Sequence, residues 1–293
     1  MRKLLRSLWR IVTSPFRIIF WIFRRIGRAL RQVGAEIGAF FSEEIEDAPV
    51  GDALSKAWDH PNELLVHVDA LRKHLLRSVG ALVLTTALSF AFFPQILAFL
   101  SIPLHGEKLV AIEVTEPIGT VMQVSLLAGV ALAFPYIALE VWLFIAPGVS
   151  RKARIWGLLA IPIATLFFLG GMAFAYFVML PAAIPILLNF MGIFTVPRPK
   201  SYISFVTALL FWLGVFFEFP LVIFLLAKLG LVKAKDLTKQ WRLAVVIIAV
   251  IAAAITPTID PVNMSLVMGP MVLLYFFSIL LAKIAQPRSV REV

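Results

Sequence analysis

The sequence of 293 residues contains no cysteine. Disulfide bridges, thiolate metal sites and cysteine nucleophiles are therefore excluded. Histidine is also scarce, with four in the chain: His60, His67, His74 and His105. The first three repeat every seven residues, which places them on one helix face but about 10.5 Å apart, too far for neighbours to share one metal ion. We predict a solvated or interfacial face here, with no metal site and no cofactor.

Charged residues are few as well, at 15% of the chain, whereas 61% is apolar and the mean hydropathy is +0.94. The surface of a soluble domain must be largely polar, so a soluble domain of this length cannot hide so much apolar area. A net charge of +10 suggests nucleic acid as a partner in a soluble protein. Here the basic residues separate apolar runs and do not form one patch. We therefore expect a membrane protein that binds no nucleic acid.

Apolar runs long enough to cross a bilayer occur four times, and two shorter runs follow. The six runs are Val79–Leu100, Pro117–Phe144, Trp156–Leu180, Tyr202–Leu226, Leu243–Ile255 and Met264–Ala282. As a helix the fifth run is about 20 Å long against a hydrocarbon core of about 30 Å, so the bilayer must thin around it or flanking residues must snorkel. We predict an all-α, polytopic integral membrane protein, a cupped bundle of six transmembrane helices of which the last two are short.

Positive charge alternates between the segments that join these runs. Arginine and lysine are frequent before the first run, after the second, after the fourth and after the sixth. The intervening loops hold little positive charge, namely Lys108, Arg198 and Lys200. This alternation obeys the positive-inside rule, so we expect both termini in the cytoplasm.

The first 58 residues differ from the rest. Apolar residues interleave with arginines, no acid occurs before Glu36, and an acidic segment, Ser42–Asp52, follows. We favour an interfacial helix on anionic lipid; a disordered basic tail is the alternative, and a seventh span would put Arg10 and Arg17 at depth. We find no cleavable signal peptide, since the segment is basic throughout. The predicted organisation is an N-terminal extension and linker at 1–58, a membrane domain at 59–286 and a short cytoplasmic tail at 287–293.

The sequence shows no catalytic motif: it has no Gly-rich phosphate loop, no HExxH and no GxSxG. The informative residues are polar groups at membrane depth. Glu218 lies eight residues before the end of the fourth run, beside Pro220, which cannot donate a hydrogen bond to the carbonyl of Phe216. A carboxylate at this depth costs about 3 kcal/mol or more, which favours a functional role. The alternative is a neutral glutamic acid that only ties two helices together.

Three further polar residues lie in or beside the runs. Glu140 is near the end of the second run, either as a site residue or as a boundary residue that reaches water. Gln123, in the same run, suits hydrogen bonding between helices. Asp260 follows Pro257 in an outer turn and suits capping of the last helix. We retain Glu140 and Asp260 as candidate binding residues.

Six segments, in order along the chain, resemble the TatC family, the polytopic core subunit of the twin-arginine protein translocase. They are His67–His74, Glu140–Gly148, Gly170–Phe177, Ser201–Phe205, Gly214–Pro220 and Ile255–Pro257. Each motif is weak alone, but their order and the count of six runs match the family. The likeness covers roughly Val66 to Gln286.

The resemblance implies a protein of the bacterial or archaeal inner membrane that is not an enzyme. Such a protein docks twin-arginine signal peptides of folded cargo at its cytoplasmic face. With single-span partners of the TatA/TatB type, it exports that cargo, driven by the proton gradient, as a homo-oligomer within a larger complex. By position, the family's binding residues correspond to Arg72 before the first run, Pro103 in the first outer loop, Phe144 and Pro147 after the second run, and the intramembrane Glu218.

The chain departs from the family pattern at two positions. Ala70 and Ala153 occupy places where the family usually has glutamates. Those carboxylates are what the family uses against the two guanidinium groups, and arginine–carboxylate pairs are strong because they are charge-assisted and bidentate. We therefore expect this protein to bind a twin-arginine peptide weakly or not at all. Glu63, Asp69 and Glu140 are the acids that remain to replace the two missing carboxylates.

Three alternative functions also fit a polytopic helical protein. A secondary transporter of a small solute would use Glu218 as its proton carrier, but such carriers have paired polar sites at mid-depth, and Glu218 has few polar neighbours in the sequence. A membrane-embedded lipid enzyme needs an acid and a base at one depth, and the sequence shows no such pair. The third alternative is a TatC paralogue that has lost twin-arginine recognition.

Overall fold

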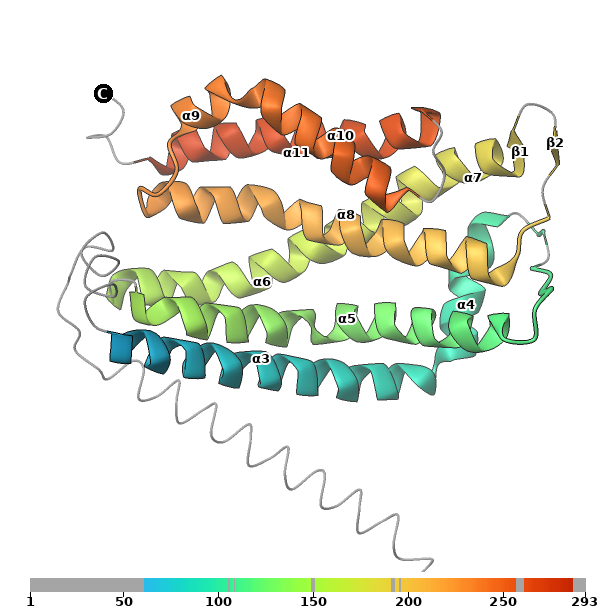
Figure 1. Ribbon diagram of the computed structural model, residues 1–293, viewed down its shortest axis with the longest axis horizontal. Coiled ribbons are helices and arrows are strands. Elements are labelled where there is room, and N and C mark those ends of the chain that lie inside the picture. Colours follow the sequence, from blue (N-terminus) through green and yellow to red (C-terminus); the bar gives the residue numbers. More distant parts are fainter. Residues whose placement is uncertain are drawn as a thin grey trace, which may run out of the picture. The chain divides into compact units, whose positions relative to one another are not determined.

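The computed structural model describes residues 61–104, 106–107, 109–148, 151–190, 193–194, 196–256 and 261–286. The chain divides into two compact units, and the larger comprises Asp59–Pro147 and Trp156–Val293. The described elements are almost all helical (Figure 1). They are α3 (Pro61–Phe90), α4 (Phe93–Ser101), η1 (Ile102–Leu104), α5 (Glu116–Ile145), η2 (Ala146–Gly148), α6 (Arg151–Phe174), η3 (Ala175–Met179), α7 (Leu180–Leu188), β1 (Asn189–Phe190), β2 (Ile193–Phe194), α8 (Pro199–Lys228), α9 (Ala234–Lys239), α10 (Trp241–Ile255) and α11 (Pro261–Ala285).

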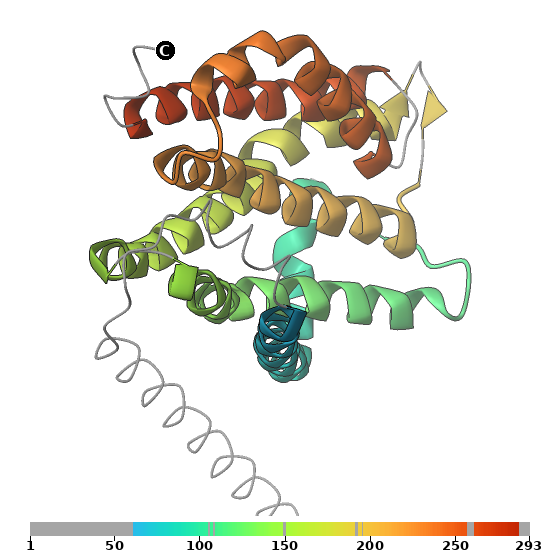
Figure 2. The same ribbon diagram turned by 60° about the vertical axis from the view of Figure 1, so that its left-hand side comes forward.

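The long helices of the larger unit pack in the order α3, α5, α8 and α11, with α10 against α11 (Figure 1, Figure 2). α6 joins this row through an aromatic stack, in which the rings of Phe134 in α5 and Phe168 lie 4.0 Å apart. The main core lies among α4, α5, α7, α8, α10 and α11. Leu180, Ile203 and Val206 are fully buried at its centre.

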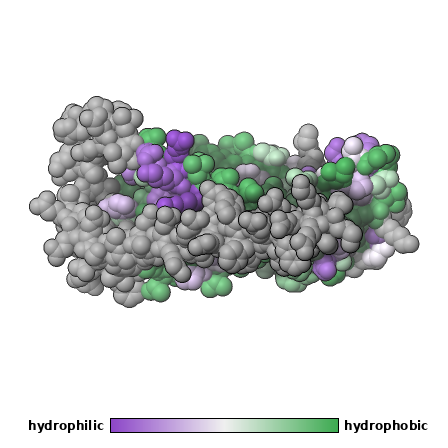
Figure 3. All heavy atoms as spheres, turned by 90° about the horizontal axis from the view of Figure 1, so that it is seen from below, coloured by the Kyte–Doolittle hydropathy of each residue, from purple (hydrophilic) through white to green (hydrophobic). Residues whose placement is uncertain are grey.

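The outward faces of these helices are apolar, as a bilayer requires. In the four helices that are long and apolar enough to cross a membrane, only 22–33% of the apolar stretch is buried inside the protein. Figure 3 shows hydrophobic residues along the middle of the described surface and hydrophilic residues gathered toward its ends. A helix with this pattern gains by facing hydrocarbon along its length and water at its ends.

Four described helices are long and apolar enough to cross a membrane. They are Glu116–Ile145, Gly157–Leu188, Pro199–Lys228 and Met264–Ala285. A bent pair, His67–Phe90 with Phe93–Leu104, supplies a further span, and Trp241–Ile255 is a shorter apolar helix. These segments confirm the predicted all-α polytopic class. The sixth segment, Met264–Ala285, has 22 residues and is longer than the predicted Met264–Ala282. Of the final two spans, only α10 is therefore short.

The first span differs from its prediction as a single helix, Val79–Leu100. α3 runs without a break from Pro61 to Phe90, and α4 then leaves it at 81°. Phe92, between them, has φ −106° and ψ 10°, outside the helical region, and Pro94 follows in the first turn of α4. Proline has no N–H to continue the hydrogen bonding of α3, which explains the break.

Two tyrosines hold α4 in place after this bend. The hydroxyl of Tyr176 donates to the carbonyl of Phe99 at 2.7 Å, and that of Tyr202 donates to the carbonyl of Leu100 at 2.8 Å. The carbonyl of Phe99 also accepts a hydrogen bond from the N–H of Ile102. The two tyrosine bonds therefore tie the end of α4 to the third and fourth spans through its backbone carbonyls. Pro103 is buried directly afterwards, in η1.

The third span contains a wide turn. In η3, a π-helix, the N–H of Leu180 donates to the carbonyl of Ala175, five residues earlier. Pro181 follows and has no N–H to return to the preceding turn. The span continues as α7, which buries Ala183 and Ile184. A short antiparallel pair, β1 with β2, then leads to α8.

The predicted N-terminal extension at 1–58 and tail at 287–293 lie outside the described residues, as does Asp260. The proposed domain boundaries therefore stay predictions, and so does capping of the last helix by Asp260.

Candidate functional site

Two predicted site residues, Glu140 and Phe144, meet two histidines of α3 near the end of α5. Nδ1 of His74 lies 2.6 Å from Oε2 of Glu140. The ring of Phe144 lies 4.6 Å from that of His67 and 6.1 Å from that of His74. We refer to His67, His74, Glu140 and Phe144 as the α3–α5 cluster.

Helix geometry explains which residues of α3 enter this cluster. At about 100° per residue, His67, Ala70 and His74 lie within about 60° of one another around the helix. Asp69 and Lys73 lie on a different side, where both are exposed and form an ion pair at 2.8 Å. Arg72, a predicted binding residue, is exposed and does not share the face of the two histidines.

Glu140 is fully buried, with a side-chain exposure of 0%. One oxygen, Oε2, contacts His74, whereas Oε1 is buried with no hydrogen-bond partner among the described residues. Leaving a buried acceptor unpaired costs about 1–3 kcal/mol. Our interpretation of Glu140 as a boundary residue that reaches water is wrong, because His74 of α3 packs over the carboxylate. His74 itself keeps 19% of its side chain exposed and so lies on the open side of the pair.

α6 supports the same end of α5. A Cβ atom at Gly157 would lie 1.7 Å from Cζ2 of the buried Trp142, so only glycine lets the two helices approach this closely. Trp142 is two residues from Glu140. The contact therefore fixes the last turns of α5, on which Glu140 and Phe144 are carried.

Glu218 lies elsewhere, on α8 where this helix crosses α6. Its carboxyl group is half-buried against the backbone of Phe168, and Oε1 is buried without a hydrogen-bond partner in the part of the chain that the structure describes. The two helices come very close here, since a Cβ atom at Gly171 would lie 2.5 Å from the carbonyl oxygen of Leu213. Glu218 is thus an intramembrane carboxyl group at a tight crossing, separate from the α3–α5 cluster.

The other predicted site residues are spread along the unit. Pro147 follows α5 in η2, at the same end as Phe144. Pro103 lies in η1, directly after α4, and α4 packs against α5. Gln123 has a buried side-chain oxygen with no hydrogen-bond partner among the described residues, so its hydrogen bonding between helices stays a prediction.

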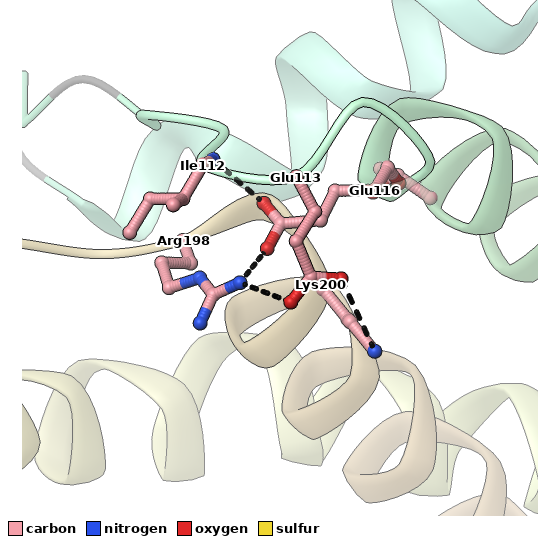
Figure 4. Close-up of polar contacts among 6 residues, drawn as sticks. Ile112, Glu113, Glu116, Arg198 and Lys200 are labelled. Carbon is pink, nitrogen blue, oxygen red and sulfur yellow. Dashed lines mark hydrogen bonds and ion pairs between the residues drawn. The ribbon is translucent and has the colours of Figure 1, made fainter.

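The structure adds a charge cluster that sequence analysis missed (Figure 4). Glu116, in the first turn of α5, is fully buried and pairs with Arg198, which directly precedes α8. Arg198 also contacts Glu113 at 3.1 Å, and Lys200 lies 4.0 Å from Glu113. The N–H of Ile112 donates to Oε2 of Glu116 at 3.3 Å. The carboxylates of Glu116 and Glu113 raise the pKa of the Arg198 guanidinium above its usual value.

His74 was also missed as a site residue. The seven-residue spacing of the histidines placed them on one solvated or interfacial face, and that prediction did not include the contact of His74 with Glu140. The described residues contain no group of three histidine or acidic side chains that suits a metal ion.

Comparison with known proteins identifies the family. The model of the family described as Sec-independent protein translocase protein (TatC) matches residues 66–270. The chain belongs to the TatC family. The TatC protein of Carboxydothermus hydrogenoformans is 34% identical over 235 residues, which are 79% of this chain and 97% of that protein. The TatC protein of Deinococcus radiodurans is 33% identical over 231 residues, 75% of this chain and 86% of that protein.

Solved TatC structures agree with this assignment. The crystal structure of the twin-arginine translocase receptor TatC matches with a TM-score of 0.66 at 30% identity, covering 75% of this chain and 99% of that one. A crystal structure of the same receptor in DDM matches with a TM-score of 0.68, covering 74% of this chain. This TatC protein is therefore a multi-pass membrane protein and a core component of a twin-arginine translocase, as the sequence predicted.

Proposed function

We propose that this TatC protein docks twin-arginine signal peptides of folded cargo at the end of the bundle where α3 begins and α5 ends. The supporting observation is the buried carboxylate of Glu140, one oxygen of which has no hydrogen-bond partner among the described residues. Phe144 beside it, Pro147 after α5 and Arg72 on the outer face of α3 complete the proposed docking surface. The protein acts there as a receptor and not as an enzyme.

This end of the bundle faces the cytoplasm in our proposal, with both termini on that side. Basic residues gather at the C-terminal end of α8 and around α9, namely Lys228, Lys233, Lys235, Lys239 and Arg242. At the opposite end, the two cations Arg198 and Lys200 are accompanied by Glu113 and Glu116, so they add no net positive charge. This asymmetry supports the positive-inside orientation.

The apolar outward faces of the spans suit single-span partners of the TatA/TatB type and further copies of this chain in one complex. Glu218 and Asp260 are the residues that we assign to partner contact, whereas the buried Pro103 shapes the first outer segment in this proposal. Glu218 supports this role because a half-buried carboxyl group with one oxygen lacking a described partner can take a hydrogen bond from a neighbouring helix. The basic N-terminal extension is proposed to lie on anionic lipid.

The docking proposal is tested by photo-crosslinking or equilibrium binding of a twin-arginine peptide to the purified protein at fixed salt. A peptide with two lysines in place of the arginines is the control. We expect the twin-arginine peptide to bind more tightly than its twin-lysine control. Equal binding of both peptides by a folded protein would contradict the proposal and would favour a TatC paralogue that has lost twin-arginine recognition.

A further inference from the structure

We infer that Glu140 is the carboxylate that receives a signal-peptide arginine, and that it does so by exchanging His74 for the guanidinium. The inference rests on the proposed docking function and names the residue that makes docking depend on arginine. This chain needs such a residue because positions 70 and 153 are alanines.

The first observation is that the carboxylate is only half-satisfied. An imidazole presents one nitrogen to Glu140, at 2.6 Å from Oε2, while Oε1 is buried without a described partner. A guanidinium presents two parallel N–H groups that match both oxygens of a carboxylate at once. Exchange of His74 for arginine therefore satisfies an oxygen that the resting pair leaves unpaired. A lysine ammonium is a point charge without this fork, so it gains less from the exchange.

The second observation concerns the position of Glu140 relative to the alanines. Ala70 precedes His74 by one helical turn on the same face of α3, and a turn is about 5.4 Å long. The carboxylate of Glu140 contacts that face at His74. Glu140, on α5, thus places a negative charge against the face of α3 that carries Ala70. Ala70 itself supplies no charge there.

The neighbouring acid is unsuited to this role. Asp69 is exposed, is paired with Lys73 at 2.8 Å, and lies about 100° around the helix from Ala70. Its carboxylate is therefore hydrated and directed away from the cluster, whereas that of Glu140 is shielded from water, where a charged pair is stronger.

The rings beside Glu140 suit a guanidinium as well. Phe144 lies between the two histidine rings, 4.6 Å from His67 and 6.1 Å from His74. A guanidinium is planar and weakly hydrated, and it stacks on aromatic faces. Because His74 is the partly exposed member of its pair, its rotation toward water uncovers the carboxylate next to the Phe144 ring.

Three single variants test the exchange, each measured as the ratio of twin-arginine to twin-lysine affinity. Glu140→Gln keeps the shape but removes the charge, and we expect it to lower the ratio about tenfold or more while twin-lysine binding is unchanged. His74→Ala removes the competitor, so the twin-arginine affinity should be equal to that of the wild type or higher. Asp69→Asn is the matched control on the exposed face and should leave the ratio unchanged.

A fourth variant distinguishes loss of the carboxylate from misfolding of the protein. Ala70→Glu added to Glu140→Gln restores a carboxylate on the facing helix, so it should recover the arginine dependence. Three results would overturn the inference. Glu140→Gln could keep the wild-type ratio of twin-arginine to twin-lysine affinity, or His74→Ala could lower that ratio as much as Glu140→Gln does. The third is that Ala70→Glu does not restore the ratio in the Glu140→Gln protein. A wild-type protein that does not distinguish the two peptides would instead overturn the docking function itself.

Discussion

Arg198 and Glu116 form an ion pair that joins two segments 82 residues apart in the chain. A backbone hydrogen bond of 3.2 Å, from the N–H of Val110 to the carbonyl of Pro197, ties the same two segments together. The connection before α5 is thereby fixed to the start of α8. Because Glu116 is fully buried, loss of its cation leaves a carboxylate that neither water nor another described cation neutralises.

Arg198→Gln should therefore destabilise the protein more than removal of an exposed charge nearby. We expect its thermal midpoint in detergent to fall by about 4 °C or more. Lys200→Gln is the control, since Lys200 is exposed and lies 4.0 Å from Glu113, and exposed pairs contribute little. Equal midpoints for the two variants would show that the buried pair does not stabilise this end of the bundle.

Adjacent glycines in α6 should respond differently to the same substitution. A Cβ atom at Gly171 would lie 2.5 Å from the carbonyl oxygen of Leu213 and 2.9 Å from Cα of Gly214, whereas one at Gly170 meets no atom within 4 Å. Gly171→Ala must push α6 and α8 apart, and overpacking of this kind costs about 1–3 kcal/mol. Gly170→Ala should be neutral or slightly stabilising, because alanine is the better helix former. Denaturant unfolding of both variants measures the difference, and a stable Gly171→Ala protein would refute the close crossing.

Glu218→Ala should leave the protein inserted and abundant but weaken export or partner docking. Glu218→Gln should be milder if the working form is a neutral hydrogen-bond donor, since glutamine preserves the shape and offers donors without charge. The measurement is export of a folded twin-arginine reporter per molecule of membrane-inserted protein. If both variants insert poorly and export per inserted molecule is unchanged, Glu218 is structural.

The orientation can be tested directly because the chain has no cysteine. Single cysteines at Val114 and Val196, which are 94% and 65% exposed, should react in intact cells with a membrane-impermeant thiol reagent. Cysteines at the exposed Lys233 and Lys239 should react only after the cells are opened. Labelling of the lysine positions in intact cells would invert the proposed topology.

The sequence predicts some spans closely and misses the bend in the first one. The predicted Pro117–Phe144 and Tyr202–Leu226 correspond to α5 and α8, because the thickness of a bilayer sets the length of an apolar run. The run Val79–Leu100 stays apolar across the bend, so hydropathy alone does not show where α3 ends. Pro94 was the available signal for the break.

The site was predictable in its α5 residues and not in their partners. Glu140 and Phe144 follow from a family motif that lies within one helix. The contact between His74 and Glu140 depends on which face of α3 meets α5, and a seven-residue spacing gives the face but not the neighbour. No local sequence pattern predicts the pairing of Glu116 with Arg198, because the two residues meet only when α5 and α8 are packed.

The tyrosine bonds to α4 also impose an order on biosynthesis. The carbonyls of Phe99 and Leu100 accept hydrogen bonds from side chains 77 and 102 residues later in the chain. At about 5–20 residues per second, a ribosome needs between about 4 and 20 s to supply these donors. During that interval, α4 has left α3 but has neither tyrosine to hold it. The first outer segment therefore reaches its final position only after the third and fourth spans have been synthesised, although it is made long before them.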